Sequence, residues 1–133
     1  MMIRLLAAAA LVAGCASPAS ATEWLNCSDT GGAASIDLLL GAMEVAAVAG
    51  MTISVGDQVW ASHVEYGPGA PVAVGQAFAS SDMLLVDAMD EAMIAKVAEL
   101  RLFKASEGEG PEVYAGTLRI PGHGAWGVIC SGP

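Results

Sequence analysis

Two histidines and a glutamate are the residues of this chain that come closest to the pattern of a metal site. His63 and Glu65 are two positions apart, so in a strand their side chains lie on one face. His123, in the turn Pro121–Gly124, could supply a third ligand, since Zn²⁺ accepts imidazole and carboxylate ligands. Such pairs also arise on ordinary surface strands, and no H-E-x-x-H motif is present. A metal-binding protein or metal-dependent enzyme using these three residues is therefore the alternative hypothesis.

Other catalytic patterns are weaker. The carboxylates of Asp82, Asp87, Asp90 and Glu91 lack the D-x-D-x-D-G register of a calcium loop, which favours a solvated acidic segment. The sequence contains no G-x-S-x-G nucleophile elbow and no G-x-x-x-x-G-K phosphate loop. These observations favour a protein that is not an enzyme and that needs no cofactor.

Two features point instead to binding. Trp126 lies close to two glycines and is a candidate for an exposed aromatic anchor, although tryptophan in a small β domain also often fills the core. The second feature is the acidic loop that contains Glu107, Glu109 and Glu112. It could attract a basic partner protein, or it could simply be the solubilising tip of a hairpin.

Cysteine usage predicts one disulfide. Cys27 and Cys130 are the pair that remains once Cys15 is assigned to the N-terminal segment. An even number of cysteines in an exported domain is typical of a disulfide, and C-x-x-C spacing is absent. A Cys27–Cys130 bond would join the first strand of the domain to the last.

Residues 1–21 have the pattern of a bacterial export signal. Arg4 precedes an apolar run at 5–13, and Ala19-Ser20-Ala21 is an A-x-A cleavage site at 19–21. An overlapping lipobox at 12–15 predicts lipidation of Cys15 instead, and the two outcomes exclude each other. The expected location is the bacterial periplasm, either as a membrane-anchored lipoprotein or as a soluble periplasmic or secreted protein. A membrane would be contacted only through the N-terminal lipid.

The charge balance excludes one class of partner. The chain has 5 basic and 14 acidic residues, and removing Arg4 with the signal leaves 4 against 14, a net charge of −10. Four cations cannot form the basic face that nucleic acid binding requires. Residues 22–133, about 112 in number, are long enough for one domain.

The elements that must position these residues are mainly strands. Apolar and polar residues alternate at 35–40, 51–55 and 58–66, and the runs 100–104 and 113–120 flank a Gly-containing loop, as in a hairpin. Further strands are expected at 23–28 and 125–130. Residues 76–107 lack Gly and Pro, and their order of acids before bases also suits a helix dipole. We interpret this region as strands at 83–87 and 95–105 around a turn or short helix.

The predicted fold is a single antiparallel β-sandwich or barrel with at most one short helix, around 88–96, and an end-to-end disulfide. In size, charge and compartment the chain resembles the bacterial lysozyme inhibitors, but their Ser-Gly-x-x-Tyr loop is absent. The nearest stretch, Ser62–Gly67, lacks the required glycine, so no family is assigned. The leading hypothesis is an exported, non-enzymatic binding or accessory module of the cell envelope.

Overall fold

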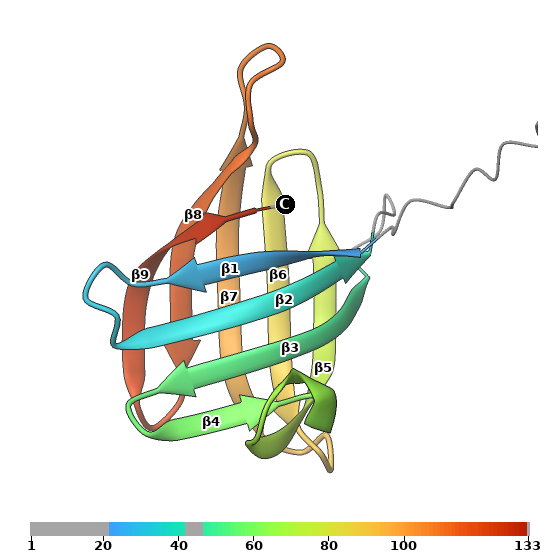
Figure 1. Ribbon diagram of the computed structural model, residues 1–133, viewed down its shortest axis with the longest axis vertical. Coiled ribbons are helices and arrows are strands. Elements are labelled where there is room, and N and C mark those ends of the chain that lie inside the picture. Colours follow the sequence, from blue (N-terminus) through green and yellow to red (C-terminus); the bar gives the residue numbers. More distant parts are fainter. Residues whose placement is uncertain (1–21, 42–46, 133) are drawn as a thin grey trace, which may run out of the picture.

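The computed structural model describes residues 22–41 and 47–132, which form nine strands and one turn of 3-10 helix (Figure 1). The predicted signal, with Cys15, lies outside the described residues. The elements in chain order are β1 Thr22–Ser28, β2 Ala34–Gly41, β3 Val48–Val55, β4 Gln58–Ala61, η1 Val64–Tyr66, β5 Ala70–Ala79, β6 Met83–Asp90, β7 Lys96–Ala105, β8 Val113–Ile120 and β9 Gly124–Ser131. No helix in the described part of the chain is long and apolar enough to cross a membrane.

The strands close into a barrel in sequence order. Each strand pairs with the next one, and β9 returns to pair with β1, so the predicted barrel alternative is the correct one. One interface departs from the predicted antiparallel arrangement. β4 and β5 run parallel over two residue pairs, Trp60–Ala70 and Ala61–Pro71, because the segment between them crosses back over the outside of the barrel instead of making a hairpin.

The interior of the barrel is filled by alternate side chains from almost every strand. Leu25, Ile36, Met51 and Leu100 are fully buried, while their chain neighbours face outward. The predicted hairpin is confirmed, and its inner face consists of five buried side chains: Leu100, Leu102, Tyr114, Leu118 and Ile120. Apolar burial of this kind is the main stabilising contribution to the fold.

No helix forms at 88–96, where the sequence allows at most one short helix. β6 continues to Asp90 and β7 begins at Lys96, with a tight turn between them. The Asp90 amide donates to the Ala95 carbonyl (2.9 Å), and the Asp90 carboxylate accepts the Ile94 amide (2.7 Å). Because these bonds close a hairpin, the turn alternative of the sequence interpretation is correct.

The strand expected over 58–66 is shorter than predicted. β4 ends at Ala61, and the chain enters η1, which leaves Val64 96% exposed instead of sharing an inward face with Trp60. The Ser62 amide donates to the Met51 carbonyl (2.9 Å), and Ser62 Oγ accepts the Met51 amide (2.9 Å). The crossover segment is thereby tied to β3 before it turns towards β5.

The predicted disulfide is present. Cys27 on β1 and Cys130 on β9 are register partners with a Cα–Cα distance of 4.0 Å. β1 and β9 pair over only three residue pairs, so the covalent bond reinforces the shortest antiparallel interface of the barrel.

Candidate functional site

The structure does not bring the predicted metal ligands together. His63 lies before η1, where its Nδ1 is 2.9 Å from Ser62 Oγ and its ring packs edge-on against Tyr66. His123 is in the β8–β9 turn, and its ring packs edge-on against Trp60. Among residues 22–41 and 47–132, no three His, Cys, Asp or Glu side chains form a group that could hold a metal ion. Glu65, expected on a strand face with His63, lies in the first turn of η1 instead.

His63 belongs to a row of aromatic contacts on the outside of β1–β3. The ring centroids of His63 and Tyr66 are 5.2 Å apart, and those of Tyr66 and Trp24 are 5.3 Å apart. A side chain at Gly50 would overlap the Tyr66 ring, so the glycine on β3 makes room for it. Thr52 Oγ1 also donates to the Tyr66 carbonyl (3.2 Å). The row therefore packs the crossover segment onto the barrel wall.

The outer surface formed by the described residues has open depressions, two of which contain acidic side chains. One, of about 420 Å³, lies beside the disulfide and contains Asp29 and Asp37. The Asp29 carboxylate accepts the Ala34 amide (2.8 Å), and this bond is the main reason that its pKa is lowered. Asp37 accepts a hydrogen bond from Asn26 (2.9 Å). The other depression, of about 700 Å³, lies under the crossover segment and includes His63 and Glu91.

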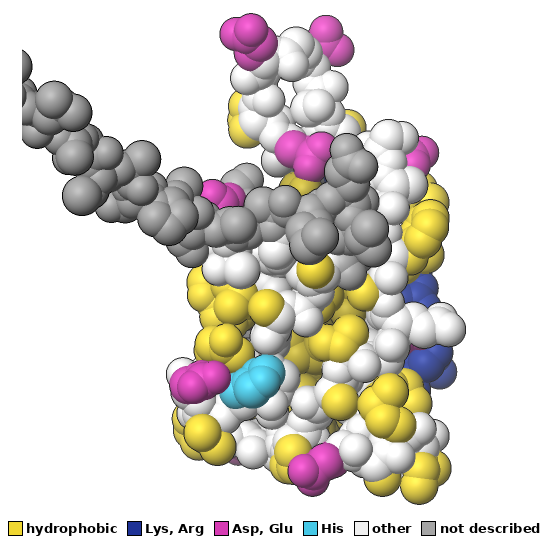
Figure 2. Space-filling model, turned by 90° about the vertical axis from the view of Figure 1, so that its right-hand side faces the viewer, with side chains coloured by type: hydrophobic (Ala, Val, Ile, Leu, Met, Phe, Trp, Pro, Cys, Tyr) yellow, Lys and Arg dark blue, Asp and Glu magenta, His cyan; other side chains and the backbone are white. Residues whose placement is uncertain are grey.

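The predicted acidic loop is the tip of the β7–β8 hairpin, which projects beyond the rest of the barrel (Figure 1). Figure 2 shows acidic side chains at the end of this projection. Glu107, Glu109 and Glu112 are all exposed, and Glu112 also accepts a hydrogen bond from the Tyr114 hydroxyl. Burial, together with this bond, raises the pKa of Tyr114 to about 12. The tip is thus acidic and anchored at its base by a buried tyrosine.

Trp126, a candidate exposed anchor, is half-buried and packs against the core. Its ring also covers Gly124, where an added Cβ would lie 3.0 Å from the indole. Trp126 therefore stabilises the barrel, as the alternative core interpretation of tryptophan anticipates.

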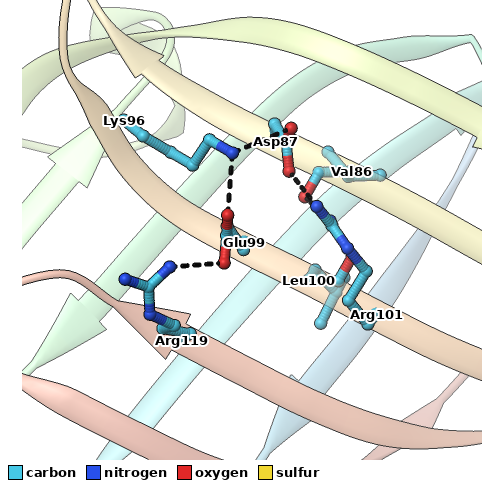
Figure 3. A network of polar contacts seen from close by, with 7 residues as sticks. All are labelled: Val86, Asp87, Lys96, Glu99, Leu100, Arg101 and Arg119. Carbon is cyan, nitrogen blue, oxygen red and sulfur yellow. Dashed lines mark hydrogen bonds and ion pairs between the residues drawn. The ribbon is translucent and has the colours of Figure 1, made fainter.

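A charged network that the sequence did not predict covers the outer face of β6–β8 (Figure 3). Asp87, Glu99 and Arg119 are register partners across the three strands. Glu99 accepts hydrogen bonds from Arg119 and from Lys96, both at 2.7 Å. Lys96 Nζ is also 3.4 Å from Asp87, so one cation lies between two carboxylates that would otherwise repel each other.

Arg101 completes this network. Its Nη2 lies 2.7 Å from Asp87 Oδ1, and its Nη1 donates to the Leu100 carbonyl (2.9 Å). The hydrogen bonds from Lys96, and then from Arg119, lower the pKa of Glu99 to about 2. Three of the four cations after the predicted signal are therefore held by two carboxylates on one face.

The sequence contains part of the information needed to predict this network. In two strands joined by a hairpin, residues at equal distances from the turn face each other, and such counting places Glu99 opposite Arg119. The count requires the hairpin register, which only the structure supplies.

Comparison of the chain with protein-family models, with curated proteins and with solved structures found no match.

Proposed function

We propose that this protein is an exported, non-enzymatic binding module of the bacterial envelope whose partner is a basic protein. In this proposal residues 1–21 direct export, and the mature chain is either a lipoprotein anchored at Cys15 or a soluble periplasmic or secreted domain. The partner is neither nucleic acid nor lipid, because the net charge is strongly negative.

The observation that carries the proposal is the uneven distribution of charge. Asp87 and Glu99 form ion pairs with three of the four cations of residues 22–133: Lys96, Arg101 and Arg119. The same segment contains twelve other acidic residues and only one other cation, Lys104. In the view of Figure 2 the basic side chains gather at one edge, while acidic ones lie on the projecting hairpin and at several other places on the surface. A projecting acidic tip attracts a cationic protein surface and accelerates its association.

The filled interior supports binding on the outside. The inward side chains of the described strands form a continuous apolar cluster, and both depressions are open surface features. A small closed barrel of this kind uses its interior for packing, so recognition depends on loops and outer faces.

The test is calorimetric titration with a twelve-residue peptide of lysine only. The variant E107Q/E109Q removes two tip charges and leaves Glu112 with Tyr114, while the matched control D57N/E65Q removes two exposed charges elsewhere. If the hairpin is the binding site, E107Q/E109Q weakens binding by about tenfold and D57N/E65Q by less than about twofold. Equal loss in both variants would show that the attraction is diffuse and would contradict a hairpin site.

A further inference from the structure

The outer face of β6–β9 carries an apolar row directly below the acidic hairpin. Met83, Phe103, Ala115 and Ile129 are successive register partners across the four strands. All four face outward, because their chain neighbours Leu84, Leu102, Tyr114 and Val128 are buried in the core. Phe103 is 67% exposed and Ile129 is 63% exposed. Neighbouring strands are about 4.8 Å apart, so the row extends over roughly 14 Å.

Two further exposed side chains enlarge this row into a patch. Val113, 60% exposed, is the next outward residue of β8 towards the hairpin tip. Phe78, 56% exposed, is the register partner of half-buried Leu85, the next outward residue of β6. The patch therefore lies between the acidic tip on one side and the outward row of Leu85, Arg101 and Thr117 on the other, beyond which lies the Asp87–Glu99–Arg119 row.

An apolar patch with charged borders is typical of a protein interface. The outward positions of a small barrel wall are ordinarily polar. Where aromatic and β-branched side chains lie exposed next to one another, they favour association with another protein. The border determines the chemistry of the partner, because acidic groups of the tip would face the edge of any protein seated on the patch.

We propose that this patch, Phe78, Met83, Phe103, Val113, Ala115 and Ile129, docks a protein surface whose apolar centre is bordered by lysine or arginine. The proposal rests on the proposed function and identifies the face that a basic partner covers. The apolar centre supplies affinity through burial, and the hairpin carboxylates select a cationic border.

The charge argues against two other occupants. A second copy of this chain carries the same strongly negative net charge, so the two copies would repel each other as they approach. A bilayer with anionic headgroups would be repelled by the same carboxylates. A basic protein is attracted by them and is the occupant to which the proposal commits.

The test uses three eighteen-residue helical peptides as probes. The first has leucine on one face and lysine on the other, the second replaces lysine by glutamate, and the third replaces leucine by serine. Affinity is measured by calorimetry, and the contact is mapped by amide chemical shifts. The Leu/Lys peptide is expected to bind tightest and to shift the amides of Phe103, Ile129 and the hairpin.

The variant I129T removes apolar surface from the patch while it keeps a β-branched side chain in the strand. The matched control V64T makes the same kind of change at an exposed residue outside the patch. Affinity for the Leu/Lys peptide should fall about tenfold in I129T and stay unchanged in V64T. Circular dichroism and a cooperative melt verify that both variants are folded.

The outcomes separate this inference from the function on which it rests. Equal affinity of I129T and V64T, together with weaker binding by E107Q/E109Q, would overturn the patch but leave the acidic hairpin site. If neither the twelve-residue lysine peptide nor the Leu/Lys peptide binds, both proposals are overturned. A dimer in sedimentation that I129T dissociates would assign the patch to a second copy, and equal affinity for phosphatidylglycerol vesicles would assign it to lipid. Either result would overturn the proposal.

Discussion

Cys27 and Cys130 are register partners across β1 and β9, and their Sγ atoms form a disulfide that links positions 103 residues apart in sequence. The bond lies at the interface where the barrel closes, and that interface has only three antiparallel residue pairs. The covalent link therefore holds together the two ends of the fold at the antiparallel interface with the fewest residue pairs.

Removal of this disulfide should lower the stability of the barrel. The double variant C27A/C130A is expected to lose about 2–5 kcal/mol of unfolding free energy, since a closed loop of roughly 100 residues restricts the unfolded chain by nearly that upper value. Denaturant unfolding measures the loss. A reductant should bring the wild type to the level of the variant and leave the variant unchanged. Free thiols at both positions in non-reducing peptide mapping would contradict the assignment.

Gly116 permits the close approach of β8 to β7. An added Cβ at this position would overlap the Arg101 carbonyl, which is backbone and cannot rotate away. We expect G116A to cost about 1–3 kcal/mol in denaturant unfolding. The matched control is G127A on β9, where the nearest atom to the new Cβ is 4.0 Å away. G127A should be neutral or slightly stabilising, because alanine loses less entropy than glycine on folding. Equal effects would be incompatible with this close approach.

Glu99 should make stability depend on acid pH. Its pKa is about 2 in the folded protein, against an ordinary value of 4.5, because Lys96 and Arg119 donate hydrogen bonds to its carboxylate. A lowered pKa stabilises the fold above about pH 4.5, and this contribution disappears as the pH falls towards 2. The difference in melting temperature between wild type and E99Q should therefore shrink over that interval. E109Q, which removes an exposed carboxylate of the hairpin tip, serves as the control for the loss of one acidic charge.

Tyr114 should produce the opposite dependence at alkaline pH. Burial raises its pKa from 10.0 to about 12, so the neutral phenol stabilises the fold below about pH 10 and this contribution disappears as the pH rises towards 12. Y114F removes both the titration and the hydrogen bond to Glu112, and it should cost about 0.5–1.5 kcal/mol at neutral pH. The free-energy difference between wild type and Y114F should become smaller above pH 10. If the free-energy difference between wild type and Y114F stayed constant up to pH 12, it would be evidence against a raised pKa of Tyr114.

Local pattern was sufficient to predict most strands. Alternation around Ile36 and Ile53 and the glycine-bearing loop after Lys104 identify β2, β3 and the β7–β8 hairpin, because these signals depend only on neighbours in sequence. β5 was not predicted. It contains Pro71 and Gly75, and its register shifts between Val74 and Ala77, so the alternation is interrupted.

The surface sites could not be read in the same way. The order of acids before bases in 82–104 suits a helix dipole, yet Asp87, Lys96 and Arg101 form ion pairs across a hairpin. Phe103 on β7 and Ile129 on β9 share an outer face because both strands pair with β8 in a fixed register. Contacts of this kind depend on pairing between distant segments, which a single sequence does not encode locally.

The central claim is that the acidic hairpin and the patch beside it bind a basic envelope protein. Its most direct test is retention of envelope proteins on the immobilised wild type, E107Q/E109Q, I129T and the control D57N/E65Q, quantified by mass spectrometry. A basic protein should be retained by wild type and D57N/E65Q, and its retention should be about tenfold lower on the other two variants. Retention of this protein should weaken when salt rises from about 0.1 M to about 1 M, as the Debye length falls from roughly 10 Å to about 3 Å and the attraction of the carboxylates is screened. Retention of no basic protein, or equal retention by all four, would contradict the account.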